Sequence, residues 1–533
     1  MTYEQGKFWK KGDPKQPFGG NVLIFGAGAI CQCGLPMWLD KVDMPPEKIT
    51  VIDMDGKKKE NIASSIAKGV KFMEHFLIKE EEQLSAFLKT MLKDGDILWD
   101  LSWEIDTVFL LSWCHDHGVM YLNTSLEVWD PCGDAFASNP HPKDRTLFQR
   151  HRELHDRLNK LPGFGGDDKG PTGIFEHGAN PGLVSHFTKK GIFDLTTAML
   201  ADPAIDADRK AKMQQALAEG KYNKLCQLTG TKVIHITERD TQITSHPRQL
   251  NEFCNTWSVQ GFYEEGIAPV EMAWGTHEKY LPKGAYIHDG PLESVWRLNV
   301  PNAKPRPGHC LCLPQAGMRT WCRSWAPGDE EEYIGIHMPH GECITVSDCL
   351  TVYDDNGNVE YMPSMYFVYC PCDDAIASLR EVEMRGYKMD GMKQRILCDE
   401  ITSGKDKLGS MLLGHDYKAW WCGCLTDIEE TRAVAPGQNA TSVQVAAGAI
   451  GGLLYAIRNP RLGFLVAEEV PWQEVLKEVE LYLGTMRSCR SDWDPLKNRC
   501  DLYKGWHSQK VDESDPWQFC NFLVPGVPDC TFE

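Results

Sequence analysis

NVLIFGAGAIC, residues 21–31, is an apolar run that breaks into a glycine–x–glycine turn. The pattern predicts a buried strand, a tight turn, and a helix whose first N–H groups face the pyrophosphate of a dinucleotide. Gly26 permits the turn, and Gly28 lets the backbone approach the phosphates. Cys31 stands at the third small position, where the helix packs on the strand. The stretch therefore predicts a doubly wound α/β domain of the Rossmann type.

A second strand supports this assignment. KITVIDMDG, residues 48–56, ends in Asp53, 27 residues after Gly26. A carboxylate there is placed to accept hydrogen bonds from the adenine ribose, which favours NAD over NADP. Asp55 is an alternative for this role, and residues 57–59, three lysines, leave NADP open.

Strands and helices continue to alternate along the chain. GDILWDLSW (95–103) and GVMYLNTSLEVW (118–129) are apolar strand candidates, and 106–117 is a predicted helix between them. Ligands of open α/β sheets bind beyond the carboxyl ends of the strands. Glu104 and Glu127 both follow such ends, so we predict that they line the crevice, although either could be a solvated loop residue.

The region after the strand at 118–129 changes character. Residues 130–143 form a predicted loop, and a charged amphipathic helix from about 144 to 158 is predicted to lie on the surface. Residues 161–173 are a glycine-rich connector. A short strand and a turn then lead into a helix that begins near Leu183.

Charge and hydropathy exclude several classes of protein. The 533 residues suffice for two to four domains and carry a net charge of −19, which argues against nucleic-acid binding. The longest apolar run, 442–457, contains Gln444 and is too short for a membrane span. The first residues lack the apolar core of a secretory signal, so a cytoplasmic protein is expected.

The 20 cysteines suggest neither zinc nor disulfides. Four pairs are separated by one residue: Cys31/Cys33, Cys310/Cys312, Cys370/Cys372 and Cys422/Cys424. This spacing is tighter than that of structural zinc sites, and no export signal favours disulfides. We expect reduced, mostly buried thiols and no bound metal.

One aromatic and acidic segment lacks a regular pattern. NTWSVQGFYEEG, residues 255–266, places Trp257 ahead of Glu264 and Glu265 in what is predicted to be an acidic turn. An indole face and carboxylates together favour a buried organic cation as ligand. Trp257 could instead be a core residue, since the chain has 17 tryptophans.

HGANPGLVSHF, residues 177–187, closely resembles the homospermidine synthases, NAD-dependent enzymes of the saccharopine-dehydrogenase-like group. The resemblance continues through NTSLEVW (123–129), VIHITERDTQ (233–242) and PHGECITVSDCLTV (339–352). Matching segments keep their order from about residue 20 to 465. The remaining tail resembles nothing informative.

This resemblance implies a redox-neutral transfer of an aminobutyl group. One amine of putrescine, or of spermidine, is oxidised to an imine by NAD. A second amine attacks the imine, ammonia leaves, and the stored hydride reduces the product to homospermidine. It also implies a homodimer formed through an inserted domain.

The resemblance also implies roles for individual residues. The predicted catalytic residues are Glu238, Trp257, Glu265, His340 and Glu342. Substrate binding is assigned to Glu104, Glu127, Asn180, Trp257, Glu265 and Glu342. NAD binding is assigned to Gly26, Gly28, Ala29, Ile30, Asp53, Ser102, Thr124 and Asn180. Glu104 departs from the aspartate of the bacterial family pattern, which leaves the substrate length open.

Several alternatives stay open at this point. Glu238 could pair with a surface cation, and His340 could be a satisfied core histidine. Glu238, Glu265 and His340 are all candidates for the general base that removes protons from the amines. The chain could also be a carboxyspermidine or saccharopine dehydrogenase with net redox turnover, or an inert NAD- or polyamine-sensing protein.

The predicted domain organisation follows from these motifs. Residues 1–180 and 429–465 should form the Rossmann NAD-binding domain, because the alanine- and glycine-rich helix after 439 suits close packing on a sheet. Residues 181–428 should form an inserted α+β substrate and dimerisation domain with a mostly antiparallel sheet. Residues 466–533 are an extension of unknown role. The active site should lie between the two domains.

Overall fold

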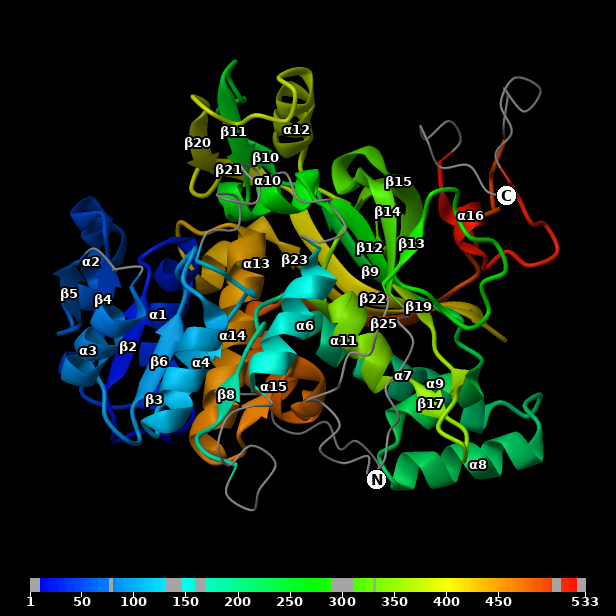
Figure 1. Ribbon diagram of the computed structural model, residues 1–533, viewed down its shortest axis with the longest axis horizontal. Helices are drawn as coiled ribbons and strands as arrows, with labels where there is room; N and C mark the ends of the chain where they lie inside the picture. Colours follow the sequence, from blue (N-terminus) through cyan, green and yellow to red (C-terminus); the bar gives the residue numbers. More distant parts are fainter. Residues whose placement is uncertain are drawn as a thin grey trace.

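Two β-sheets organise the computed structural model, which describes residues 10–75, 80–129, 146–158, 169–288, 310–328, 332–500 and 510–524. Figure 1 shows the first sheet and its helices, in blue, on one side of the molecule. The long green and yellow strands of a second sheet lie on the other side.

The first sheet has seven parallel strands in the order β24-β8-β7-β6-β2-β4-β5. Their bounds are β2 (Val22–Phe25), β4 (Ile49–Asp53), β5 (Lys71–Glu74), β6 (Ile97–Asp100), β7 (Met120–Asn123), β8 (Gly173–Ile174) and β24 (Phe464–Leu465). β2, β6 and β7 are buried along their whole length, as strands covered on both faces by helices must be. The predicted doubly wound α/β class is confirmed.

Helices cover both faces of this sheet. They include α1 (Ala29–Lys41), α2 (Ala63–Ile66), α3 (Glu81–Met91), α4 (Thr107–Asp116) and α14 (Ala440–Arg458). α14 contacts α1 and β7. A Cβ added to Gly448 would lie 1.9 Å from the carbonyl oxygen of Gly178, and one added to Gly452 would lie 2.7 Å from Leu122. Glycine at these positions therefore lets α14 approach the sheet closely.

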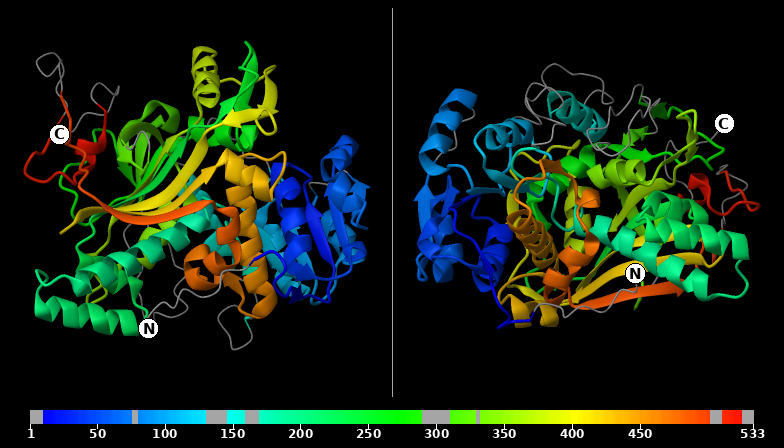
Figure 2. Two further views of the ribbon diagram at one scale, coloured as in Figure 1. Left: turned by 180° about the vertical axis from the view of Figure 1, so that it is seen from behind. Right: turned by 90° about the horizontal axis from the view of Figure 1, so that it is seen from below.

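α14 is also long and apolar enough to cross a membrane by length and composition alone. However, 89% of its most apolar window is buried inside the protein, which is typical of a core helix. Figure 2 shows this helix, in orange, between the two sheets.

The second sheet has ten strands and is mixed. The order along its main path is β13-β14-β12-β19-β9-β22-β23-β25, and β15 and β16 join through β19. The bounds are β9 (Val233–Asp240), β12 (Pro269–Ala273), β13 (Tyr286–Ile287), β14 (Cys310–Ala316), β15 (Trp321–Trp325), β16 (Glu332–Met338), β19 (Ser364–Cys370), β22 (Lys405–His415), β23 (Lys418–Asp427) and β25 (Thr485–Ser491). β9 and β19 run parallel, and the other recorded pairings in this sheet are antiparallel.

Further helices and small two-stranded sheets lie around the two large sheets. The helices are α6 (Leu147–Leu158), α7 (Leu183–Ala201), α8 (Ala207–Ala218), α9 (Tyr222–Thr229), α10 (Val259–Ile267), α11 (Gly341–Cys349), α12 (Asp373–Met384), α13 (Ile428–Val434), α15 (Trp472–Val479) and α16 (Phe519–Phe522). The small strands are β1 (Gln16–Pro17), β3 (Val42–Asp43), β10 (Ile243–Thr244), β11 (Glu252–Asn255), β17 (Val352–Tyr353), β18 (Val359–Tyr361), β20 (Lys393–Ile396) and β21 (Ile401–Ser403). α7 lies along β22 and β23, as the rear view in Figure 2 shows.

Two local predictions are wrong. The helix from about 144 was expected on the surface, but α6 buries Phe148, His151 and Leu154, because these residues form one stripe at helical spacing. Glu264 and Glu265 were expected in a turn, but they lie in α10, whose first turn is capped by the side chain of Ser258.

Residues after 465, to which the sequence assigned no role, contribute to both parts of the protein. α15 packs against α7 and α14, and β25 extends the second sheet beyond β23. Residues 510–524 return to this sheet, where Leu523 forms a bridge with Cys322.

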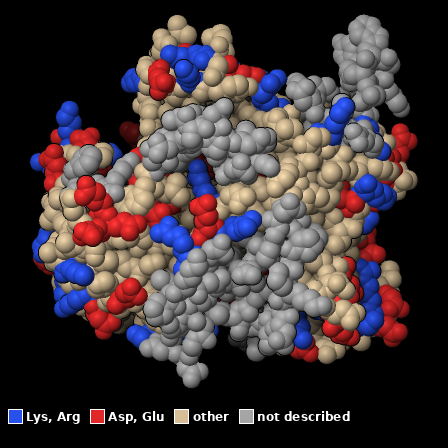
Figure 3. Space-filling model, viewed as in Figure 1, with Lys and Arg blue, Asp and Glu red and all other residues tan. Residues whose placement is uncertain are grey.

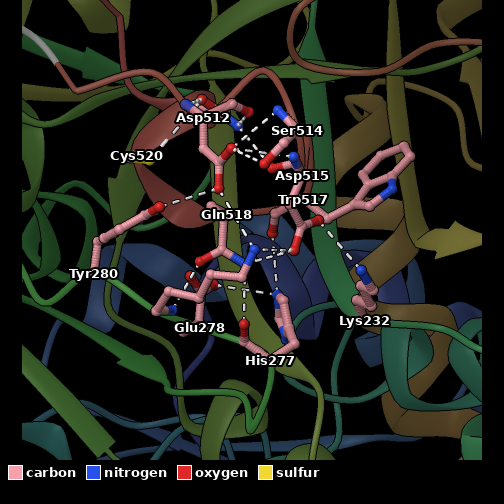
Figure 4. A network of polar contacts seen from close by, with 12 residues as sticks. Lys232, His277, Glu278, Tyr280, Asp512, Ser514, Asp515, Trp517, Gln518 and Cys520 are labelled. Carbon is pink, nitrogen blue, oxygen red and sulfur yellow. Dashed lines mark hydrogen bonds and ion pairs between the residues drawn. The ribbon is translucent and has the colours of Figure 1, made fainter.

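A polar network holds this last described segment in place (Figure 4). Asp515 forms ion pairs with Lys232 at 3.2 Å and with Lys279 at 3.1 Å. Glu278 accepts a hydrogen bond from the backbone N–H of Phe519. Burial raises the pKa of Glu278 to about 7.

Candidate active site

A cavity of about 270 Å³ lies between the two sheets and is lined from both. The first sheet contributes the segments after β6, β7 and β8. The second contributes β9, β19, α10 and the start of α11, and α6 forms a further wall. On the face that Figure 3 shows, basic and acidic side chains lie side by side near the centre.

The glycine turn of the first sheet fits a dinucleotide. Gly26 has a φ of +89°, and a Cβ there would lie 2.6 Å from the carbonyl oxygen of Leu101. A Cβ on Gly28 would meet nothing within 4 Å, so the space in front of this residue is open. Gly28 is the N-cap residue of α1, and no side chain caps this end, which leaves the first N–H groups of the helix, including that of Ala29, for an anion.

Asp53 lies at the end of β4, next to this turn. Its carboxylate accepts hydrogen bonds from the N–H groups of Ala27 at 2.8 Å and Asp55 at 2.9 Å, and Lys58 lies 3.2 Å away. Asp53 therefore fixes the shape of the turn, in addition to its predicted role at the ribose. The rival Asp55 caps a short 3₁₀ helix by accepting from Lys57.

The other predicted NAD-binding residues lie along the cavity. Ile30, Ser102, Thr124 and Asn180 all line it. Ser102 and Thr124 follow the carboxyl ends of β6 and β7, where the ligand crevice of an open α/β sheet is expected.

Trp257 lines the cavity with a partly exposed indole. Its ring N–H donates to the hydroxyl of Tyr369 at 3.1 Å, and Phe262 meets the ring edge-on at 5.7 Å. A Cβ on Gly261 would lie 3.0 Å from the indole, so glycine there makes room for the ring. The indole is thus held at its edges while part of it faces the cavity.

His340 lies between two acidic side chains. Its Nε2 is 3.4 Å from Glu265, and its Nδ1 is 3.6 Å from Glu342, which also accepts the backbone N–H of Gly182. Burial alone would lower the pKa of His340, but the two carboxylates raise it to about 10. Burial raises the pKa of Glu265, and that of Glu342 to about 7. The imidazole is therefore charged at neutral pH.

Glu238 belongs to a second acidic group. It accepts a hydrogen bond from the side-chain amide of Asn180 at 2.6 Å. Burial and the neighbouring Asp406 raise its pKa well above the ordinary range. Burial and the carboxylate of Asp240 raise the pKa of Asp406 in the same way. Burial and mutual repulsion therefore both favour the protonated form of these acids.

Glu127 lines the cavity on the side of the first sheet. It accepts hydrogen bonds from Ser125 Oγ at 2.8 Å and from the N–H of Glu104. Burial, together with the charge of Glu264, raises the pKa of Glu127 to about 7. Glu104 has a φ of +60° and contributes through its backbone, because its side chain is not among those that line the cavity.

Three functional candidates escaped the sequence analysis. Glu176 lines the cavity and lies 3.2 Å from the buried His151. Burial alone would lower the pKa of His151, but the charge of Glu176 raises it. Arg150 lines the cavity from α6 and contacts Glu264 at 2.5 Å. Glu176 could have been found, because it follows the end of β8 as Glu127 follows β7.

The structure also brings Glu271, His288 and Cys310 together, with one candidate ligand atom of each within 4.8 Å of the others. Glu271 already accepts the backbone N–H of Leu147 at 2.7 Å and pairs with His288 at 3.1 Å. The group therefore fixes the first turn of α6. The four cysteine pairs predicted as thiols are buried and form no disulfide within the described ranges.

Comparison with known proteins places this geometry in a family. The model of the saccharopine dehydrogenase NADP binding domain matches residues 22–162, and that of the saccharopine dehydrogenase C-terminal domain matches residues 178–485. Homospermidine synthase of Blastochloris viridis is 33% identical over 508 residues, covering 95% of this chain and 97% of that protein. The chain belongs to the homospermidine synthase family. The homospermidine synthase of Mesorhizobium japonicum is 32% identical over 508 residues, which cover 95% of this chain and 96% of that protein.

A solved homospermidine synthase shares the whole architecture. The crystal structure from Legionella pneumophila, in complex with NAD, is 31% identical and has a TM-score of 0.78. The match covers 96% of this chain and 99% of that one. The family resemblance predicted from the sequence is confirmed, and so is the Rossmann NAD-binding fold of the first sheet.

Proposed function

We propose that the protein is an NAD-dependent homospermidine synthase that joins two putrescine molecules with release of ammonia, and that spermidine can replace the donor. The observation that carries the proposal is the lining of the cavity, where Trp257 lies among five glutamates: Glu127, Glu176, Glu238, Glu264 and Glu265. A buried organic dication is stabilised by such an arrangement, because an unpaired buried charge is strongly disfavoured.

NAD would be held by the turn at Gly26 and Gly28, by the N-terminus of α1 and by Asp53. When bound, it supplies reversible hydride transfer at the carbon next to the reacting amine. The carboxylate of Asp53, joined to the turn, favours NAD over NADP. The solved relative in complex with NAD supports the same choice.

The protein's own groups provide orientation and proton transfer. Glu265 and Glu342, with His340 between them, hold an ammonium group and position it. Glu127 has a pKa of about 7, so it can accept a proton from an ammonium group near neutral pH and return it later. The walls on both sides of the cavity exclude water from the imine, which would otherwise hydrolyse.

A carboxylate substrate, as in saccharopine metabolism, fits this cavity poorly. Arg150 is the one lysine or arginine among the described lining residues, and it already pairs with Glu264. The cavity therefore favours amines over amino acids. By family resemblance we also propose a cytoplasmic location and a homodimer formed through the second sheet's domain. Light scattering of the purified protein would test the dimer.

The decisive experiment is incubation of the purified protein with putrescine and a catalytic amount of NAD. The proposal expects homospermidine and ammonia in equal amounts without net NADH. Net accumulation of NADH would indicate a dehydrogenase instead. Binding of putrescine without any product would indicate a sensing protein.

A further inference from the structure

The charges around the cavity are not all available to a substrate. Three of the five lining glutamates have a cationic partner within the fold. Glu264 contacts Arg150 at 2.5 Å, Glu265 lies 3.4 Å from His340, and Glu176 lies 3.2 Å from His151. The three partners are all charged or have raised pKa values.

The two remaining glutamates have neutral hydrogen-bond donors. Glu127 accepts from Ser125 and from a backbone N–H, and Glu238 accepts from Asn180. Within the described ranges, neither lies in an ion pair. Glu127 follows β7 of the first sheet and Glu238 lies in β9 of the second, so they face the cavity from two sides. Both therefore remain available to ammonium groups of a substrate, whereas Glu264 is already paired with Arg150.

Arg150 withholds one carboxylate of the cavity, that of Glu264, from a substrate. It pairs with Glu264 of α10, and its charge also offsets part of the rise in the pKa of Glu127. Its position is set from outside the cavity. Glu271 of β12 accepts the N–H groups of Leu147 and Phe148 and so fixes the first turn of α6, one turn before Arg150.

We propose that Arg150 is a specificity-determining residue that selects diamines over longer, more highly charged polyamines. Its guanidinium occupies the carboxylate that a third ammonium group would need, and it repels that group. This inference rests on the proposed polyamine activity. A purely structural Arg150, serving to join α6 to α10, would affect stability without affecting the choice of amine.

Arg150→Gln tests the proposal, with Arg157→Gln as the matched control. Arg157 lies on the same helix and is also paired with a carboxylate, that of Asp106, at 3.1 Å, but it does not line the cavity. Dissociation constants for putrescine and spermidine are measured by calorimetry on enzyme saturated with NADH, which cannot oxidise the amine. The measured quantity is the ratio of the two constants.

We expect Arg150→Gln to shift this ratio towards spermidine by about tenfold, the scale of one charge-assisted contact. Arg150→Lys and Arg157→Gln should keep the wild-type ratio. The double variant Arg150→Gln/Glu264→Gln should not show this shift towards spermidine, because it lacks the Glu264 carboxylate that Arg150→Gln alone would free.

Three results would overturn the proposal. One is an unchanged ratio in a folded Arg150→Gln variant, and another is an equal shift in Arg157→Gln. The third is a double variant that keeps the gain, which would mean that the smaller side chain merely makes space. Failure of the wild-type protein to bind putrescine would instead count against the proposed function itself.

Discussion

Replacing Trp257 separates a substrate-binding indole from a core indole. In the structure its indole donates one hydrogen bond, to Tyr369, and meets Phe262 edge-on at the margin of the core. These are worth about 1 kcal/mol and about 0.5–1.5 kcal/mol respectively. Trp257→Ala should therefore lower the free energy of unfolding by roughly 1.5–2.5 kcal/mol. Trp421 is the internal control, because it is fully buried, and Trp421→Ala should cost about 3–5 kcal/mol.

The two substitutions should affect activity in the opposite order, so that Trp257→Ala lowers kcat/KM more than Trp421→Ala does. A desolvated cation on an indole face contributes about 2 kcal/mol, which corresponds to a loss of about 30-fold or more in kcat/KM for putrescine when the ring is removed. Trp257→Phe keeps a weaker aromatic face and should retain part of the activity. NAD affinity should stay unchanged in both variants, because Trp257 lies just before α10 and is not among the residues assigned to NAD.

The assay combines melting temperature, NAD affinity and kcat/KM for Trp257→Ala, Trp257→Phe and Trp421→Ala. If Trp257→Ala destabilises the protein as much as Trp421→Ala and loses NAD binding, the indole is part of the core. Full activity in a folded Trp257→Ala variant would equally refute a role in holding the substrate.

Four further outcomes are expected. Asp53→Ala should weaken NAD binding more than putrescine binding, because it removes the hydrogen bond to the N–H of Ala27 and the partner of the ribose. An NAD affinity equal to that of the wild type, measured by calorimetry, would contradict this. Glu265→Gln should raise the KM for putrescine by an amount equivalent to about 1.5–3 kcal/mol, measured by steady-state kinetics, and an unchanged KM would exclude it as an ammonium ligand. Because burial raises the pKa of Glu127 to about 7, its carboxylate, the form that binds ammonium, accumulates as the pH rises. We therefore expect kcat/KM to increase through pH 7, and Glu127→Gln should remove this increase. Activity should also survive thiol reductants and metal chelators; loss with a chelator and recovery with metal would show a required ion.

The parts of the fold that depend on local pattern could be predicted from the sequence. The turn at Gly26 and the strand ending in Asp53 carry their own signals, because glycine conformation and strand periodicity are local properties. The rule that ligands lie beyond strand ends placed Glu127 at the cavity. The same rule applied to β8 would have added Glu176.

The parts that depend on distant partners could not be predicted. α6 has a charged composition, and Glu271, which holds its first turn, lies more than a hundred residues later in the chain. Asp406 has no sequence signal of its own. It lies opposite Asp240 in the β9–β22 register and so becomes a neighbour of Glu238 only through strand pairing.

The position of α14 also constrains how the chain can be synthesised. This helix packs on β7 and α1, yet it begins at Ala440, whereas the strands that it covers are complete by Ile174. At 5–20 residues per second, a ribosome needs roughly 15–50 s to make the intervening chain. For that time the apolar face of the nascent parallel sheet lacks its covering helix and its edge strand β24. A chaperone that binds exposed apolar surface should therefore associate with this protein during translation and leave after α14 emerges.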